Sequence, residues 1–393
     1  MAYSDVIGHR SMVFDTTRND AYAAAIERLV TPDSVVLDLG CGLGIHGLIA
    51  ARAGARKVFL VDPEIVVECA REVAVHNGYG QQIQAFRGRI EDIELPEKVD
   101  LIISVFTGNL LYSEDLLPSL FFARDRWLRP GGKLIPDAAE LLCAPVTAPY
   151  LRSDRIESWS QPHLGFDYSP MRRFAGNAMT ADREAKALPQ LLADPAVVAT
   201  SDFTCAKETN LDATVQFEVH TAALCDGLHG WIRIKVGDQW LATGPGAPPM
   251  HWTPQTLLVD PPLALEAGQQ LDLRLRRPAF GDWTWDLAAS SGRRRSSTFL
   301  SQPAALAQFA MRSPSASPRL DSGGEAALRV LQGFAEGAQS QRIAADLTVR
   351  FPSKFPDAGR AMQFVGAMAV AYCENQWPPT LRSGPHLMAS ASR

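Results

Sequence analysis

Apolar residues in the first 145 positions form short β-rich runs that alternate with stretches of helical spacing. The runs, each of the length of a buried strand, lie at 35–39, 57–61, 83–87, 99–103 and 133–136. The helical stretches lie at 20–30, 46–53, 63–76 and 114–127. This alternation predicts an α/β fold with a doubly wound parallel sheet, in which a ligand binds outside the carboxyl ends of the strands.

From about residue 196 the pattern changes to β-type runs separated by turns rich in glycine and proline. These runs lie at 213–220, 229–236, 254–259, 269–276 and 282–287. Their spacing predicts an antiparallel sandwich or barrel. The segment 150–195 is mixed and partly helical, and the arginine run 293–295 is expected to be a solvated loop.

A third pattern begins beyond residue 300. Residues 301–324 combine prolines, serines and Gly323–Gly324, which predicts a linker. Apolar residues at helical spacing then predict three short amphipathic helices between 325 and 375.

Composition and charge narrow the function classes. A hydrophobic content of 46% with 21% charged residues is ordinary for a globular protein. The net charge of −5 gives no reason to expect nucleic acid or an anionic membrane as a partner. The chain lacks a long apolar run and a basic-then-apolar start, so a cytoplasmic protein is expected. Six cysteines without Cys-x-x-Cys spacing predict reduced thiols and no metal site or disulfide framework.

The first strand leads directly into a glycine-rich turn. Asp38 lies in the strand, and glycines follow at positions 40, 42 and 44, where they let the backbone approach a ligand. The second strand ends in Asp62, which is placed to bind the two hydroxyls of a ribose. The form Asp-x-Gly-Cys-Gly-x-Gly differs from the dinucleotide pattern and resembles the S-adenosylmethionine site of class I methyltransferases.

Several separated motifs in the first 300 residues resemble the protein arginine methyltransferase family. They include His9-x-x-Met12-x-x-Asp15-x-x-Arg18, the stretches 88–96 and 123–132, and Met250–His251–Trp252. The chain is interpreted as a divergent, bacterial-type member. The resemblance implies a cofactor-binding methyltransferase domain at 1–147 and a β-barrel substrate domain at 148–300. It further implies a dimerisation arm at about 150–195, a homodimer, and a peptide, protein or small-molecule acceptor.

The resemblance also implies roles for individual residues. Arg18 would hold the methionine carboxylate of the cofactor, Asp62 its ribose and Glu91 its adenine amino group. His251 with Asp15 would orient the site and take up a proton. The other residues expected around the cofactor are His9, Met12, Asp38, Gly40 and Gly42, with Tyr3 as a further wall residue.

The chain departs from the family in the acceptor loop, residues 104–115. A guanidinium has no available lone pair and is held by fixed carboxylates during methylation. The family supplies two glutamates there, but Val105 occupies the first position and Glu114 remains at the second. Three interpretations stay open. The acceptor is an arginine held by Glu114 with a compensating acid such as Asp115, or it is a different nitrogen or oxygen, or the chain is an inactive binding module.

The segment 325–375 resembles the small winged-helix domains of PQQ-biosynthesis D type, which bind leader peptides. The resemblance is carried by 327–331, 333–337, 343–347 and 350–352. It implies a peptide-binding role, and the alternative is an appendage that packs against the barrel.

Overall fold

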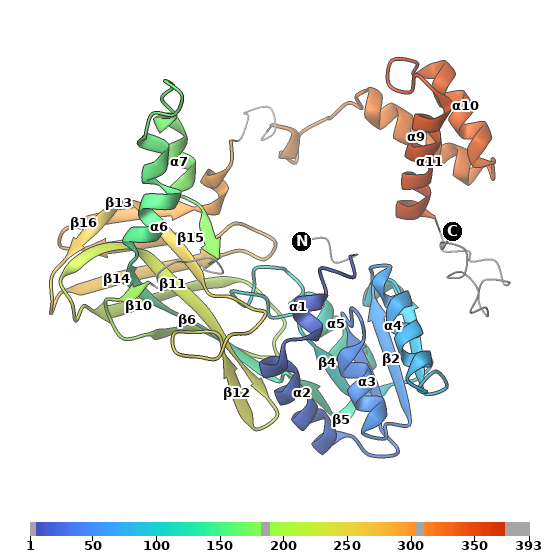
Figure 1. The fold of residues 1–393 in the computed structure, drawn as a ribbon, viewed down its shortest axis with the longest axis horizontal. Helices are drawn as coiled ribbons and strands as arrows, with labels where there is room; N and C mark the ends of the chain where they lie inside the picture. The colour runs from blue at the N-terminus through green and yellow to red at the C-terminus, as the bar shows by residue number, and fades with distance from the viewer. Residues whose placement is uncertain (1–4, 182–188, 304–309, 374–393) are drawn as a thin grey trace. The chain divides into compact units, whose positions relative to one another are not determined.

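The computed structural model describes residues 5–181, 189–303 and 310–373, and the chain forms two compact units, residues 1–303 and 304–393. The first unit contains a parallel sheet flanked by helices, followed by two antiparallel sheets (Figure 1). The predicted order of a doubly wound sheet followed by a barrel-like antiparallel domain is confirmed.

Each of the five predicted runs lies in a strand of the parallel sheet, with the last strand beginning five residues before its predicted start. In the spatial order β3-β2-β1-β4-β5 the strands are Ile83–Arg87, Lys57–Asp62, Val35–Leu39, Val99–Ser104 and Leu128–Ile135. Both faces of β1 are buried, as a strand covered by helices on two sides requires. The chain continues to β2 on one side of β1 and returns to β4 on the other, so the switch point lies at the carboxyl end of β1.

Helices cover this sheet at the predicted positions, with small shifts at their ends. They are α1 (Arg10–Val13), α2 (Thr16–Leu29), α3 (Ile45–Arg52), α4 (Val66–His76) and α5 (Leu117–Trp127), with the short helix η1 at Ile90–Asp92. Helix α2 begins four residues before the predicted start at 20, because the Asp15 side chain accepts the backbone N–H of Arg18 and caps the helix.

The antiparallel part has more strands than the sequence predicted. One sheet contains β10 (Leu211–Glu218), β14 (Gln270–Arg277), β15 (Thr284–Ala289) and β16 (Gly292–Ser297). The other contains β6 (Ala138–Thr147), β7 (Met179–Ala181), β8 (Gln190–Leu191), β9 (Ala196–Asp202), β11 (Ala223–Val236), β12 (Gln239–Ala242) and β13 (Gln255–Leu265). The arginine run expected to be a loop forms β16, in which Arg293 pairs with Asp286 on the neighbouring strand.

A helical arm is inserted between β6 and β7 and projects away from the antiparallel sheets (Figure 1). Its elements are α6 (Pro149–Arg155), η2 (Glu157–Ser160), η3 (Ser169–Met171) and α7 (Arg172–Ala175). The buried Arg152 guanidinium at its base donates to Asp226, to Asp260 at 3.2 Å and to the carbonyl of Val259 at 2.6 Å. Arg172 donates to Asp260 as well, so two arginines of the arm are fastened to β11 and β13.

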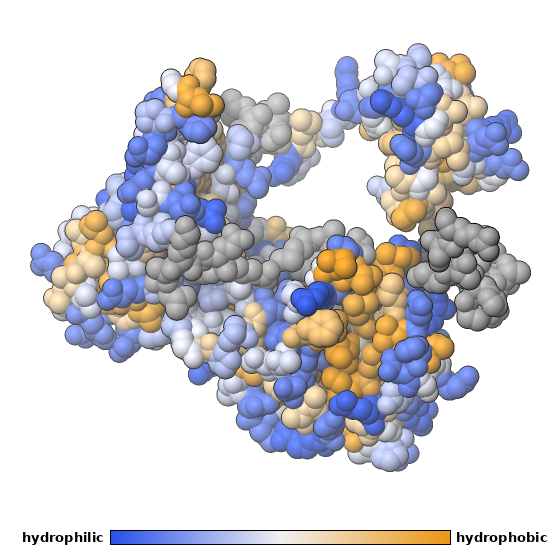
Figure 2. Space-filling model, viewed as in Figure 1, coloured by the Kyte–Doolittle hydropathy of each residue, from blue (hydrophilic) through white to orange (hydrophobic). Residues whose placement is uncertain are grey.

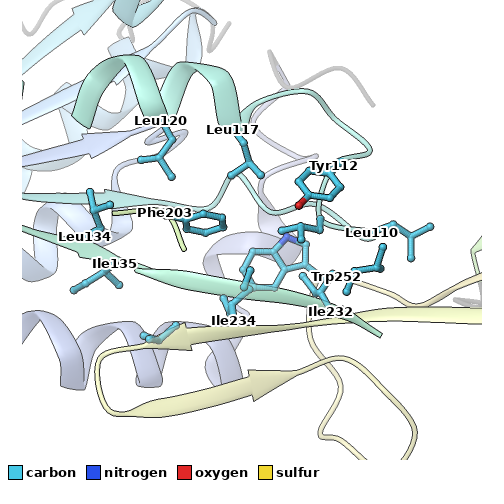
Figure 3. Close-up of a cluster of buried hydrophobic side chains, with 14 of the residues drawn as sticks. Leu110, Tyr112, Leu117, Leu120, Leu134, Ile135, Phe203, Ile232, Ile234 and Trp252 are labelled. Atoms are coloured by element: carbon cyan, nitrogen blue, oxygen red, sulfur yellow. The ribbon is translucent and has the colours of Figure 1, made fainter. Parts of the chain in front are cut away.

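The parallel and antiparallel parts of the first unit share one hydrophobic core. Figure 3 shows side chains from both parts in contact at their junction: Leu110, Tyr112, Leu117, Leu120, Leu134 and Ile135 meet Phe203, Ile232, Ile234 and Trp252. Since Leu110 and Tyr112 belong to the acceptor loop, this loop is held between the two parts.

The second unit has its own core, formed by three helices. They are α9 (Ser322–Ala335), α10 (Ser340–Arg350) and α11 (Ala358–Tyr372), which match the three predicted helices. Helix α9 begins inside the predicted linker, because the Asp321 carboxylate accepts the N–H groups of Gly323 and Gly324. No helix among the described residues is long and apolar enough to span a bilayer.

Candidate active site

The glycine loop after β1 is in contact with two other segments of the chain. Gly40, Gly42 and Gly44 have φ values of 70°, 52° and 76°, in the left-handed region that favours glycine. A Cβ atom on Gly40 would overlap the Phe106 ring, and one on Gly42 would lie 2.7 Å from the His9 ring. The loop is therefore packed against both the acceptor loop and the N-terminal segment.

Asp62 lies at the end of β2 and holds the glycine loop. Its Oδ2 accepts the backbone N–H of Gly42 at 2.9 Å, and its Oδ1 accepts that of Glu64 at 2.9 Å. Burial raises the pKa of the Asp62 carboxyl above its usual range, although these two hydrogen bonds and nearby His9 act in the opposite direction. The Asp62 carbonyl accepts the N–H of Gly88, which ties the segment leading to Glu91 to the same place.

Asp38 lies beneath the loop and fixes the first turn of α3. Its side chain is 2% exposed, and its Oδ2 accepts the N–H of Gly47 at 2.7 Å. Burial raises the pKa of Asp38 to about 7, with a further increase from the charge of Asp62. Asp38 thus supports the loop through the helix that follows it.

Arg18 provides a buried cation beside this loop. Its Nη2 donates to the Met12 carbonyl at 2.7 Å, its Nε donates to Asn19, and its guanidinium lies 5.5 Å from the centre of the Trp252 ring. Burial lowers the pKa of Arg18, and the carboxylate of Asp15 partly offsets this effect. A buried guanidinium with these contacts is suited to bind an anionic group of a ligand.

The predicted pair of His251 and Asp15 is brought together across the sequence. Asp15 Oδ2 accepts the backbone N–H of His251 at 2.6 Å, and His251 Nδ1 lies 3.2 Å from the Ser11 hydroxyl. Because Asp15 also caps α2, one carboxylate fixes both the N-terminal helix and the barrel loop that carries the imidazole.

Glu91 lies in η1, and its side chain is partly buried, with 29% exposed. Its Oε1 accepts the Ser119 hydroxyl at 2.6 Å, and its Oε2 forms an ion pair with Arg89, whose Nε lies 3.5 Å away. Burial would raise the pKa of Glu91, but the Ser119 hydrogen bond and the charge of Arg89 keep it below its usual value. An ionised carboxylate has further acceptor capacity and can accept a ligand N–H group.

The acceptor loop has fixed attachments at its centre and at its end. Asn109 Oδ1 accepts the N–H of Thr253, next to Trp252, at 2.8 Å. Gly108 has a φ of 52°, and a Cβ there would lie 3.2 Å from the Glu114 carboxyl carbon, so this exposed glutamate folds back over the loop. Val105 is partly buried and packs against the core.

Asp115 is engaged elsewhere, contrary to its suggested role as a compensating acid. It accepts two hydrogen bonds from the buried Arg277, one of them at 2.8 Å, and a third from the N–H of Phe280 at 2.9 Å. Although burial opposes it, the pairing with Arg277 keeps the pKa of Asp115 below its usual range. This carboxylate therefore supports the loop from the barrel side.

Sequence reasoning did not identify His46, which lies in the first turn of α3. Its ring stacks on the Tyr22 ring at a centroid distance of 4.6 Å, and the Tyr22 hydroxyl donates to the Ser104 carbonyl at 3.0 Å. A histidine at the start of an otherwise apolar helix next to the glycine loop was the available signal. Tyr3, predicted as a wall residue, lies outside the described residues.

Comparisons with known proteins agree with this arrangement. The model of a methyltransferase domain matches residues 36–132, and that of the arginine methyltransferase oligomerization subdomain matches 137–281. The chain is 32% identical over 277 residues to protein arginine N-methyltransferase 6 of Xenopus laevis, covering 67% of this chain and 81% of that protein. It is 34% identical over 288 residues to the probable histone-arginine methyltransferase CARM1 of Oryza sativa subsp. indica, covering 70% of this chain. It spans 54% of that relative, about half its length.

Solved structures show the same fold. The Trypanosoma brucei PRMT1 enzyme-prozyme complex with AdoHcy matches with a TM-score of 0.68 and 28% identity, covering 76% of this chain and 99% of that chain. Arabidopsis thaliana protein arginine methyltransferase 10 matches with a TM-score of 0.64 and 24% identity, covering 75% and 99% of the two chains.

Proposed function

Because the chain belongs to the protein arginine methyltransferase family, we propose that it transfers a methyl group from S-adenosylmethionine to a nitrogen of an arginine or arginine-like acceptor. The proposal is carried by the grouping of the glycine loop, the Asp62 carboxylate and the buried Arg18 guanidinium at the carboxyl edge of the parallel sheet. The acceptor would be part of a peptide, a protein or a metabolite.

The residues at this edge fit the three parts of the cofactor. The Glu91 carboxylate suits the adenine amino group, the Asp62 carboxylate suits the ribose hydroxyls, and Arg18 suits the carboxylate. His9 and Met12 would complete the wall. The bound cofactor supplies an electrophilic methyl group on a positively charged sulfur.

The chain's own residues would orient the acceptor and receive its proton. Glu114 would hold the acceptor in line with the methyl group, and a fixed negative charge there favours the transition state for transfer. His251, on a loop fixed by Asp15, would take up the proton that the methylated nitrogen releases.

A second candidate is an acceptor other than a guanidinium. It is favoured because Val105 gives the acceptor loop an apolar side chain and the Asp115 carboxylate of the same loop is hydrogen-bonded to Arg277. With one glutamate in the loop, a nitrogen or oxygen acceptor other than a guanidinium is the competing substrate class. Such an acceptor belongs to peptide or natural-product chemistry, and it needs one carboxylate as orienter or base.

Incubation with isotope-labelled S-adenosylmethionine separates these candidates. The acceptors would be arginine peptides, free arginine and a lysate, and mass spectrometry would locate the label. Label on a guanidinium nitrogen supports the proposal, and label on another nitrogen or on oxygen supports the second candidate. Binding of cofactor without transfer to any acceptor would instead favour an inactive binding module.

We also propose that the chain forms a homodimer through its arm. The arm exposes large apolar side chains at Trp159, Leu164, Phe166 and Tyr168, with Leu164 84% exposed. Figure 2 shows apolar side chains gathered over the helical side of the parallel sheet. In a symmetric dimer, the apolar surface of the arm of each protomer can pack against the apolar surface of the parallel-sheet part of its partner, so both surfaces become buried.

We propose that the second unit binds a peptide substrate. We also propose that the chain is a divergent, bacterial-type member of the family. The three-helix core at 322–372, separate from that of the first unit, supports a distinct role. A chain ending at residue 303 should have a raised KM for a peptide acceptor and an unchanged KM for a short acceptor. An equal rise in KM for the peptide and the short acceptor would favour a role of the second unit in stabilising the rest of the chain. The cytoplasmic location stays a prediction.

A further inference from the structure

His46 is a buried polar residue for which the fold provides no hydrogen-bond partner. Its side chain is 4% exposed, and its Nε2 has no partner among the described residues. A buried donor or acceptor left in this state costs free energy, so it is usually satisfied by a ligand or a water molecule. The ring is held in one orientation by its stacking on Tyr22.

His46 lies close to Arg18, because Tyr22, on which the His46 ring stacks, follows Arg18 by one turn of α2. Burial, together with the positive charge of Arg18, lowers the pKa of His46 to about 3, so the ring is neutral near pH 7. A neutral imidazole carries one N–H donor and one acceptor nitrogen. The Nε and Nη2 atoms of Arg18 are already engaged by Asn19 and Met12, which leaves part of the guanidinium for a ligand.

We propose that His46 is a second positioning residue for the amino-acid end of the cofactor, where its Nε2–H donates a hydrogen bond to the carboxylate attracted by Arg18. The inference rests on the proposed function, because the carboxylate belongs to S-adenosylmethionine or its demethylated product. Arg18 supplies the charge, and His46 supplies a directional contact from the first turn of α3. The two side chains reach this end of the site from different helices, α2 and α3.

Calorimetry with two ligands tests this role without a turnover assay. S-adenosylhomocysteine carries the carboxylate, and 5′-methylthioadenosine lacks the whole amino-acid end. His46→Leu should weaken binding of the first about 10- to 100-fold and change binding of the second less than about twofold. His46→Gln, which keeps an N–H donor, should lose less. His76→Leu, at an exposed histidine of α4, is the matched control and should change neither affinity.

Two results would overturn the inference. One is an unchanged affinity of His46→Leu for S-adenosylhomocysteine, and the other is an equal loss for both ligands, which would make His46 a packing residue. If the variants fail to fold, the ¹⁵N resonance of His46 Nε2 in the wild-type chain decides. The resonance should shift when S-adenosylhomocysteine is added and should not shift with 5′-methylthioadenosine. The same shift with both ligands, or no shift with either, would contradict the inference. A wild-type chain that binds neither ligand would remove the proposed function itself.

Discussion

The carboxylates in this site differ in the groups to which they are hydrogen-bonded. Asp62 binds the glycine loop directly, Asp38 supports it through Gly47, and Asp115 pairs with Arg277 on the barrel side. The positions of Asp38 and Asp62 could be predicted, because both follow from short patterns within one strand and turn. The engagement of Asp115 could not, since its partner is 162 positions away along the chain.

Asp62→Ala should weaken binding of S-adenosylhomocysteine by about 1.5–3 kcal/mol. The variant loses charge-assisted hydrogen bonds to a ribose and the hydrogen bond that holds Gly42. Titration calorimetry measures the effect, and Asp272→Ala, at an exposed position of β14, is the control. Unchanged affinity in Asp62→Ala would show that the ribose is bound elsewhere.

Glu114→Gln should reduce turnover by about two to four orders of magnitude, or about 2.7–5.4 kcal/mol, with cofactor affinity nearly unchanged. The reason is that the fixed charge acts on the acceptor in the transition state. Steady-state kinetics and calorimetry on the same preparations separate the two effects. Glu218→Gln, at an exposed end of β10, should behave as wild type. Wild-type turnover in Glu114→Gln would refute the assignment.

Val105→Glu distinguishes the two acceptor classes. Restoring a second glutamate should raise turnover on arginine peptides if the loop is otherwise suited to a guanidinium. The measurement is the initial rate on arginine peptides and on the native acceptor, once labelling has identified it. Loss of native activity with no gain on arginine would mean that the apolar side chain of Val105 matches an uncharged face of the acceptor.

Whole elements were easiest to predict where both faces of a strand are buried. The runs of β1, β2 and β4 are largely apolar, so these strands were found at nearly their observed bounds. Strand β5 begins at Leu128, five residues before its predicted start, because its first half is polar and contains Pro130 and two glycines. Strand β6 was missed because it contains Pro145 and lies next to the arm, and β16 was missed because its three arginines resemble a loop. In β16 these residues are compatible with a strand because it is an edge strand with exposed alternate side chains.

The base of the arm depends on a buried ion pair. Asp226→Ala should lower the free energy of unfolding of the first unit by about 3–5 kcal/mol, because it removes a partner of the buried Arg152. Asp212→Ala, which breaks the exposed pair with Arg274, should cost much less, because water and salt screen that pair. Urea unfolding followed by tryptophan fluorescence measures both. Equal small losses would show that Asp260 alone holds the arm.

The whole molecule combines a unit that carries the candidate chemistry with a separate helical unit. Both matched family models lie within residues 1–303, and the second unit has its own core. The three helices of that unit could be predicted from apolar spacing, but their role could not, because spacing of this kind specifies packing and no ligand chemistry.

At this scale we expect a dimer with about twice the 42.8 kDa mass of the chain in light scattering at tens of micromolar. The double variant Leu164→Asp with Phe166→Asp should shift the mass to that of a monomer, because it places charges in the apolar surface of the arm. Val349→Asp, at a residue of α10 that is 79% exposed, is the control and should remain dimeric. A monomeric wild-type chain would rule out the arm-mediated dimer.

The contact between the Phe106 ring and Gly40 has a thermodynamic consequence. Phe106 belongs to the acceptor loop and Gly40 to the glycine loop, and no side chain at Gly40 separates them. We therefore expect a shift of the glycine loop on ligand binding to move the segment proposed to orient the acceptor. By thermodynamic linkage, the factor by which bound cofactor would change the affinity for the acceptor equals the factor by which bound acceptor would change the affinity for the cofactor. We therefore expect the binding of cofactor and acceptor to be energetically coupled through this ring contact.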